Sequence, residues 1–108
     1  MKQHRYRITV EHVQDPGGNP VTRAPLVFDT GNHDDIFAIV ERMRGRGDFD
    51  PDTATSFAVG LKLFSEVLLE NRDHPLFAEF QPHFKQFMKQ LKKGPAQLGD
   101  PAADPETP

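Results

Sequence analysis

Two polar clusters hold the side chains of this chain that are best suited to chemistry. The first cluster is His33-Asp34-Asp35, and the second ends in Asp73-His74. Imidazole nitrogens and carboxylate oxygens bind metal ions, and imidazole transfers protons near neutral pH. The first cluster lies at the start of one predicted helix, and the second lies at the end of the next. If these two helix ends lie side by side in the fold, the two clusters meet. The candidate residues of such a small-ligand or metal site are His33, Asp34, Asp35 and His74.

Helix capping is the alternative interpretation of both clusters. Asn32 and the two aspartates would accept hydrogen bonds from the free amides at the start of a helix. His74 would cap a short helix that begins at Pro75. A ligand set requires the side chains to converge in space, whereas capping needs only local sequence. The sequence therefore favours capping and gives no confident metal ligand.

The other motifs for catalysis or cofactor binding are incomplete. The chain has no cysteine, which excludes thiolate nucleophiles and cysteine-bound zinc. The aspartate-rich stretch 48–52 is not an EF-hand, because Thr53 and Val59 replace its required glycine and glutamate. Ser56 and Ser65 lie in a helical pattern with no nucleophile elbow around them. We identify no catalytic residue and expect no cofactor, and the residues favour a protein that is not an enzyme.

The charge pattern argues against nucleic acid and membranes as partners. Three of the 16 acidic residues lie at positions 100–106, so the rest of the chain balances 13 acidic with 13 basic residues. Five arginines, at positions 5, 7, 42, 44 and 46, could form one basic face. A protein that binds single-stranded nucleic acid also needs aromatic rings on its basic face. Tyr6 lies on the side of the predicted β-strand that is opposite to Arg5 and Arg7. There is no signal peptide and no apolar run of membrane length, so we expect a cytoplasmic protein.

Alternation of apolar and polar residues predicts the first structural element, a strand over residues 4–14. Tyr6, Ile8 and Val10 face one side of this strand, and polar residues face the other, namely Arg5, Arg7, Thr9 and Glu11. Residues 26–30 predict a second strand, antiparallel to the first. The segment between them contains Gly17-Gly18 and several prolines, which indicates a connection longer than a tight hairpin turn.

Helical periodicity and capping residues predict the rest of the fold. Three longer helices are expected, from Asn32 to about 45, from the Asp50-Pro51 cap to about Arg72, and from Pro82 to about 93, with a helical turn after Pro75. The middle helix has so broad an apolar surface that we expect it to be covered on two or more sides. Gly60 lies within it and indicates a close approach of another backbone.

Four stretches of the sequence carry a resemblance to a known family. They are HRYRITVEH at 4–12, NHDDIFAIVERM at 32–43, AVGLKLFSEVLLENRDHPLF at 58–77 and FKQFMKQLK at 84–92. In order and spacing they resemble a small family of bacterial proteins of about ninety residues, which is described as a domain of unknown function. The resemblance implies a small α+β fold and a bacterial protein, and it implies no activity and no catalytic residue.

Together these patterns predict an α+β domain over residues 1–94, with a two-stranded antiparallel sheet packed on three helices in the order β-β-α-α-α. Residues 95–108 are rich in proline and aspartate and predict a disordered tail. Two strands are too few for an independently stable sheet, and their edges invite pairing. We therefore expect one of two kinds of protein. It is either a homodimer, in which dimerisation extends the sheet, or a protein-interaction module with an unknown protein partner.

Overall fold

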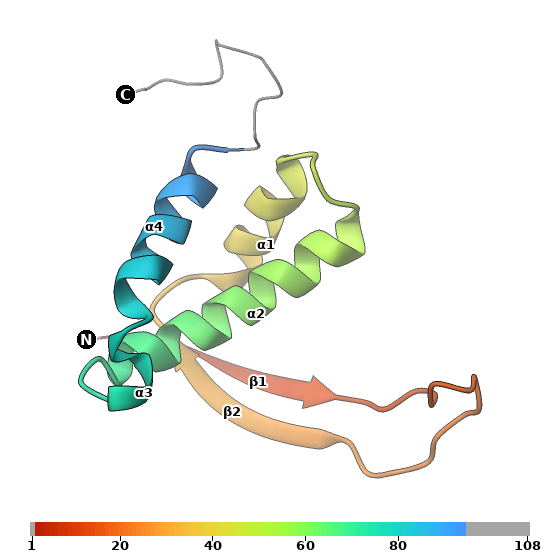
Figure 1. Ribbon diagram of the computed structural model, residues 1–108. Helices are drawn as coiled ribbons and strands as arrows, with labels where there is room; N and C mark the ends of the chain where they lie inside the picture. Colours follow the sequence, from red (N-terminus) through yellow and green to blue (C-terminus); the bar gives the residue numbers. More distant parts are fainter. Residues whose placement is uncertain (1, 95–108) are drawn as a thin grey trace. The chain divides into compact units, whose positions relative to one another are not determined.

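The structure is a computed structural model that describes residues 2–94. Its elements, in chain order, are β1 (His4–Val10), β2 (Leu26–Asn32), α1 (Ile36–Gly45), α2 (Pro51–Glu70), α3 (Pro75–Ala78) and α4 (Gln81–Lys92) (Figure 1). This confirms the α+β class and the predicted order, with α3 as the helical turn after Pro75. The predicted tail, residues 95–108, lies outside the described residues.

The chain divides into two compact units, a hairpin unit that ends at Asp35 and a helical unit that begins at Ile36. Each unit has its own internal framework. Packing of the sheet on the helices, and the union of residues 1–94 in one domain, stay predictions. No helix in residues 2–94 is both long and apolar enough to cross a membrane.

The hairpin unit is built on β1 and β2, which pair antiparallel from His4 opposite Asn32 to Val10 opposite Leu26. The period-two pattern that predicted β1 is reflected in its burial, because Tyr6 and Ile8 are half-buried while their neighbours in the strand are exposed. β1 ends at Val10, four residues earlier than predicted, and β2 continues two residues past the predicted end, to Asn32.

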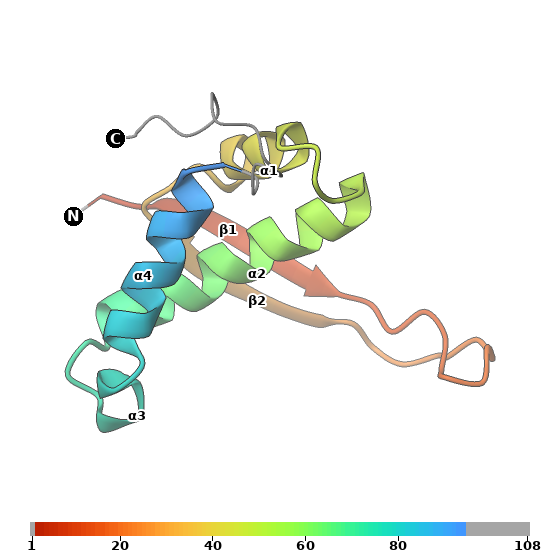
Figure 2. The same cartoon turned by 45° about the horizontal axis from the view of Figure 1, so that its top comes forward.

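The long connection between the strands contains a second, smaller turn. Gln14 forms an isolated bridge with Pro20, and the Asp15 carboxylate accepts hydrogen bonds from the backbone N–H groups of Gly17 and Asn19 at 3.0 and 2.9 Å. These hydrogen bonds lower the pKa of Asp15, and the bond from the backbone N–H of Asn19 has the largest effect. Gly18 has φ of +88°, which suits glycine. The connection extends beyond the ends of both strands (Figure 2).

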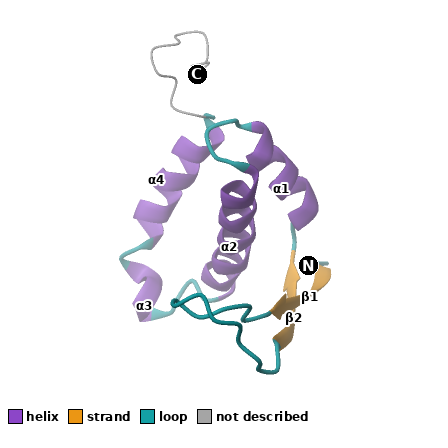
Figure 3. Ribbon diagram, turned by 90° about the vertical axis from the view of Figure 1, so that its right-hand side faces the viewer, coloured by secondary structure: helices purple, strands orange, loops and turns teal. Residues whose placement is uncertain are grey.

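The helical unit packs α1 and α4 on opposite sides of α2 (Figure 3). Its buried cluster consists of Met43 from α1 and of Ala54, Ala58 and Leu61 from α2. The two alanines are fully buried, so α1 approaches α2 over small side chains. Residues of α4 pack against this cluster with half-buried side chains, namely Phe84, Met88 and Leu91.

Capping residues set the ends of α2 as the sequence predicts, with one difference at its C-terminus. The Asp50 carboxylate accepts a hydrogen bond of 2.7 Å from the backbone N–H of Thr53, and Pro51 occupies the first turn. This bond lowers the pKa of Asp50. α2 ends at Glu70, before the predicted Arg72, because the side chain of Asn71 donates a hydrogen bond of 2.8 Å to the carbonyl oxygen of Val67.

Of two further predictions about α2, one is wrong and the other is confirmed for part of the helix surface. Gly60 does not mark a close backbone approach, because a Cβ at this position would meet no atom within 4 Å. The prediction that α2 is covered on two or more sides is confirmed where α1 and α4 pack on it, whereas Phe64 and Val67 are 42% and 47% exposed. Glu66, in contrast, is buried, although its side chain ends in a carboxyl group.

Candidate functional site

His74 acts as a helix cap. Its Nδ1 atom accepts a hydrogen bond of 3.1 Å from the backbone N–H of Leu76, and Pro75 occupies the first turn of α3. The imidazole ring also lies against the ring of Phe77, with 5.6 Å between the ring centroids. The capping interpretation of His74 is therefore confirmed.

The cluster His33-Asp34-Asp35 lies in the turn that follows β2, and it does not cap α1 in the way the sequence suggested. The prediction that the helix begins at Asn32 is wrong, because α1 begins at Ile36 and no acidic residue lies in its first turn. Asn32 is the last residue of β2 and is fully buried. Its Oδ1 atom accepts a hydrogen bond of 3.0 Å from the backbone N–H of Asp34, which turns the chain after the strand.

Tyr6 fixes the same turn from the opposite strand. Its hydroxyl group donates a hydrogen bond of 3.3 Å to the carbonyl oxygen of Asp34. Tyr6 is the only tyrosine of the chain, and its ring also stacks on His4, with 6.0 Å between the centroids. The backbone of the cluster is therefore held by side chains of both strands, Asn32 from β2 and Tyr6 from β1.

A metal site is not apparent from the geometry within residues 2–94. No group of three or more His, Cys, Asp or Glu side chains lies close enough together there to hold a metal ion. His33, Asp34 and Asp35 belong to the hairpin unit and His74 to the helical unit. Their use as one ligand-binding or metal-binding set stays a prediction.

The most conspicuous surface of the hairpin unit is apolar. Residues directly opposite each other in an antiparallel pair point to the same face. Tyr6 lies opposite Thr30, Ile8 opposite Phe28, and Val10 opposite Leu26. One face therefore carries a continuous set of large apolar residues, the apolar stripe, which consists of Tyr6, Ile8, Val10, Leu26 and Phe28. Within the stripe, Val10 is 51% exposed, Leu26 61% and Phe28 40%.

The opposite face of the hairpin is polar and internally neutralised. Arg7 lies opposite Asp29, and its guanidinium donates two hydrogen bonds to the carboxylate at 2.8 and 3.2 Å. The hydrogen bond from Arg7 lowers the pKa of Asp29, and it raises the pKa of Arg7 in turn. The positive charge of Arg5 lowers the pKa of Asp29 further. Both partners of the pair are well exposed, so we attribute cross-strand register to it rather than large stability.

A cluster of phenylalanine rings forms the second apolar surface, in the helical unit. Phe64 of α2 contacts the rings of Phe77, Phe80 and Phe84, with centroids 6.0 to 6.4 Å apart. Phe80 is 40% exposed, close to the value for Phe64. The cluster connects α2 to α3 and to the start of α4. The rings of Phe64 and Phe80 each face solvent in part.

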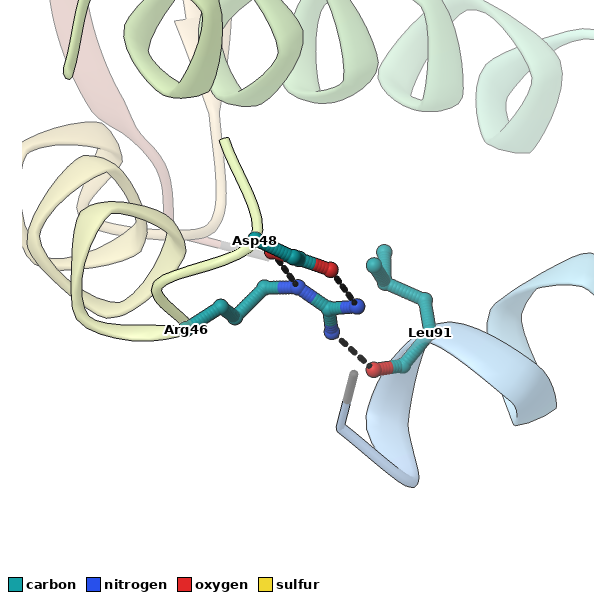
Figure 4. A network of polar contacts seen from close by, with 3 residues as sticks. All are labelled: Arg46, Asp48 and Leu91. Atoms are coloured by element: carbon teal, nitrogen blue, oxygen red, sulfur yellow. Dashed lines mark hydrogen bonds and ion pairs between the residues drawn. The ribbon is translucent and has the colours of Figure 1, made fainter. Parts of the chain in front are cut away.

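Arg46 connects the loop after α1 to the C-terminal end of α4 (Figure 4). Its Nη1 atom donates a hydrogen bond of 2.8 Å to the carbonyl oxygen of Leu91. Its Nε and Nη2 atoms donate to the Asp48 carboxylate at 3.1 and 2.9 Å. These bonds lower the pKa of Asp48. A guanidinium at this position also neutralises the negative end of the α4 dipole.

Comparison with known proteins places the chain in a family. Residues 4–93 match the family described as a domain of unknown function with a solved structure, DUF3861. The chain belongs to this family. The match covers the span over which the sequence carried its resemblance, from the first strand to the last helix.

A solved structure supports membership in the DUF3861 family. The chain is similar to a protein of unknown function (eca1910) from Pectobacterium atrosepticum SCRI1043, known from a crystal structure, with 40% sequence identity and a TM-score of 0.74. The similarity covers 85% of this chain and 99% of that one. No curated protein matches the chain.

Sequence reasoning missed three side chains with structural roles. Asn32 and Glu66 are the buried polar residues within the described part of the chain, and neither was expected to be buried. The sequence placed Arg46 only among five arginines that could form one basic face, but its side chain binds the end of α4. The spacing Arg46-x-Asp48 in a turn is the one local signal for this role, because it allows the carboxylate to orient the guanidinium.

Proposed function

We propose that this protein is a non-enzymatic module that associates with a second copy of itself through the hairpin unit. The observation that carries the proposal is the apolar stripe on a sheet that has two strands in the described residues. Isolated exposed apolar residues are common on protein surfaces, but a contiguous set on one face indicates an interaction surface.

The two-stranded sheet supports the same conclusion. A hairpin of two strands is marginally stable in water, and the outer edge of a strand can pair with a strand of another chain. Pairing with another copy at a sheet edge supplies the missing strands, and it gives the apolar side chains beside the junction neighbours from the other copy. A homodimer built in this way has a closed two-fold symmetry, which is the commonest form of protein association.

The non-enzymatic part of the proposal rests on the nucleophiles that the chain contains. The chain has no cysteine. Ser56 and Ser65 both lie within α2, and the hydroxyl group of Ser65 donates a hydrogen bond to the carbonyl oxygen of Lys62 in the preceding turn. In this geometry the hydroxyl group of Ser65 donates to its own helix and not to a general base.

Size-exclusion chromatography with light scattering over a range of protein concentrations tests the proposal. We expect a dimer whose dissociation constant rises at least about tenfold in Val10→Lys, because the charge replaces a half-exposed apolar side chain of the stripe in both copies. Val27→Lys is the matched control, since Val27 is 49% exposed but points to the polar face of the same hairpin. A wild-type protein that is monomeric at every concentration contradicts the proposal.

A further inference from the structure

The two edges of the sheet differ in their ability to accept another strand. Pro25 directly precedes β2, and proline has no N–H group to donate to a neighbouring strand. β1 contains no proline, and no proline follows it before Pro16. β1 also contains no lysine, a residue that commonly protects exposed edges. The outer edge of β1 is therefore the one without a proline.

On the basis of the self-association proposed above, we infer that β1 pairs with β1 of a second copy, antiparallel, about a two-fold axis at Ile8. The product is a four-stranded sheet in the order β2-β1-β1-β2. Such a pairing is isologous, so it closes after two copies. It also keeps the apolar stripes of both copies on the same face of the extended sheet, because the axis is perpendicular to the sheet.

The register follows from the charges along the polar face of β1. With the axis at Ile8, residues at equal distances on either side of Ile8 lie opposite each other. Arg5 then lies opposite the partner's Glu11, and this pair occurs twice by symmetry. Arg7 lies opposite the partner's Thr9, so no two like charges meet, and Asp29 already neutralises Arg7. Opposite charges in cross-strand pairs stabilise a sheet, and like charges destabilise it.

The apolar stripe agrees with this register. Ile8 lies opposite the partner's Ile8, and Tyr6 lies opposite the partner's Val10. Both positions of each pair are apolar, so the stripe continues across the junction without interruption. Val10, which is 51% exposed in one copy, gains an aromatic neighbour on its open side.

Other symmetric registers are less favourable. An axis at Tyr6 or at Arg7 places arginine opposite arginine, as Arg5 opposite the partner's Arg7 or as Arg7 opposite its own equivalent. An axis at Thr9 pairs only the last three residues of β1, because the strand ends at Val10. It also places Arg7 opposite the partner's Glu11, but Asp29 already neutralises Arg7. The axis at Ile8 pairs residues 6–10 of both copies, and it places Arg5 opposite the partner's Glu11, the residue that directly follows β1.

Cysteine cross-linking tests the register directly, because the natural chain contains no cysteine. Residues opposite each other on adjacent strands have Cα atoms about 4.5–5.5 Å apart, which suits a disulfide. We expect Ile8→Cys to form a disulfide-linked dimer under oxidised glutathione. Arg7→Cys and Thr9→Cys are matched controls, since each forms a symmetric disulfide only in one of the competing registers. Faster cross-linking of either control overturns the inference.

Charge exchange tests the same register without altering the apolar stripe. Arg5 and Glu11 are both exposed, so their substitution leaves the fold of the single copy intact. We expect Arg5→Glu to raise the dissociation constant of the dimer about tenfold or more, and the double variant Arg5→Glu/Glu11→Arg to restore it. Arg42→Glu, at an exposed arginine of α1, is the control and leaves the constant unchanged.

The outcomes separate this inference from the proposed function. A wild-type monomer contradicts both. A wild-type dimer that ignores the charge exchange, and in which Ile8→Cys cross-links no faster than the controls, contradicts the β1 register and leaves self-association standing. Rescue by the double variant together with cross-linking at Ile8 supports the inference.

Discussion

Arg46 and Leu91 are joined by a hydrogen bond of 2.8 Å across 45 positions of the chain, from the loop after α1 to the end of α4. The side chain of Arg46 is only 16% exposed. The interaction therefore holds α4 at its C-terminal end, where the half-buried residues Met88 and Leu91 pack on the cluster of α1 and α2.

We expect Arg46→Ala to destabilise the protein by about 1 kcal/mol, because a hydrogen bond from a charged group to the helix end is lost. The cost stays moderate because the Leu91 carbonyl also accepts a hydrogen bond from the backbone N–H of Gly94. Urea unfolding monitored by circular dichroism measures the change. Arg42→Ala is the control, since Arg42 is an exposed arginine of α1, the helix that precedes Arg46. Equal stability of the two variants would contradict the role of Arg46.

Stability should decrease in acid through Asp48. Hydrogen bonds from Arg46 hold the pKa of this carboxyl group below its ordinary value of 3.8. A group whose pKa is lowered by folding stabilises the native state above its unfolded pKa, and this contribution disappears as the pH falls through the folded pKa. We therefore expect the contribution to be complete above about pH 5 and to diminish below about pH 4.

Urea unfolding at a series of pH values measures this contribution. Asp48→Asn should make the acid-induced loss of stability shallower, and Arg46→Met should do the same because it removes the cause of the pKa shift. The loss should not vanish, because folding also lowers the pKa values of Asp15, Asp29 and Asp50. An unchanged pH profile in Asp48→Asn would show that the ion pair does not form in solution.

Gly60 offers a stabilising substitution. It is exposed in the middle of α2, and an added Cβ would meet open space. Gly60→Ala should therefore raise the free energy of unfolding by roughly 0.5–1 kcal/mol. Gly47→Ala is the opposite control, because Gly47 has φ of +83° and alanine there should cost about 1–2 kcal/mol. A destabilised Gly60→Ala would reveal a close contact at that position.

Divalent metal ions should leave the thermal unfolding midpoint unchanged. No three potential ligands form a group within residues 2–94, and the Nδ1 atom of His74 already accepts a hydrogen bond. A thermal-shift screen with Zn²⁺, Ni²⁺, Mn²⁺ and Mg²⁺ measures this, with His74→Ala as the control. A rise in the midpoint that His74→Ala abolishes would support the alternative site at His33, Asp34, Asp35 and His74.

Local sequence was sufficient where one residue type has one structural use. The alternation of Tyr6 and Ile8 predicted a strand and its buried face, and Asp50-Pro51 predicted the start of α2. Proline after a polar cap fixes the first helical turn whatever lies elsewhere in the chain. The order of all the elements could therefore be predicted.

Local sequence was insufficient where a residue has two uses. Asn32 can cap a helix or form a turn after a strand, since its Oδ1 atom accepts a backbone N–H in both cases. The four-residue difference in the start of α1 follows from this ambiguity. Arg46 bonds to a carbonyl group 45 positions away, and no periodic pattern contains such information.

The position of Tyr6 in the hairpin unit, where its hydroxyl group bonds to Asp34, has a practical consequence for optical measurements. The chain contains no tryptophan and a single tyrosine, so its intrinsic fluorescence originates almost wholly in the hairpin unit. Far-ultraviolet circular dichroism, in contrast, is dominated by α1, α2 and α4. Two spectroscopic signals of one unlabelled sample thus follow the two units separately, and their melting curves coincide only if both units unfold as one cooperative block.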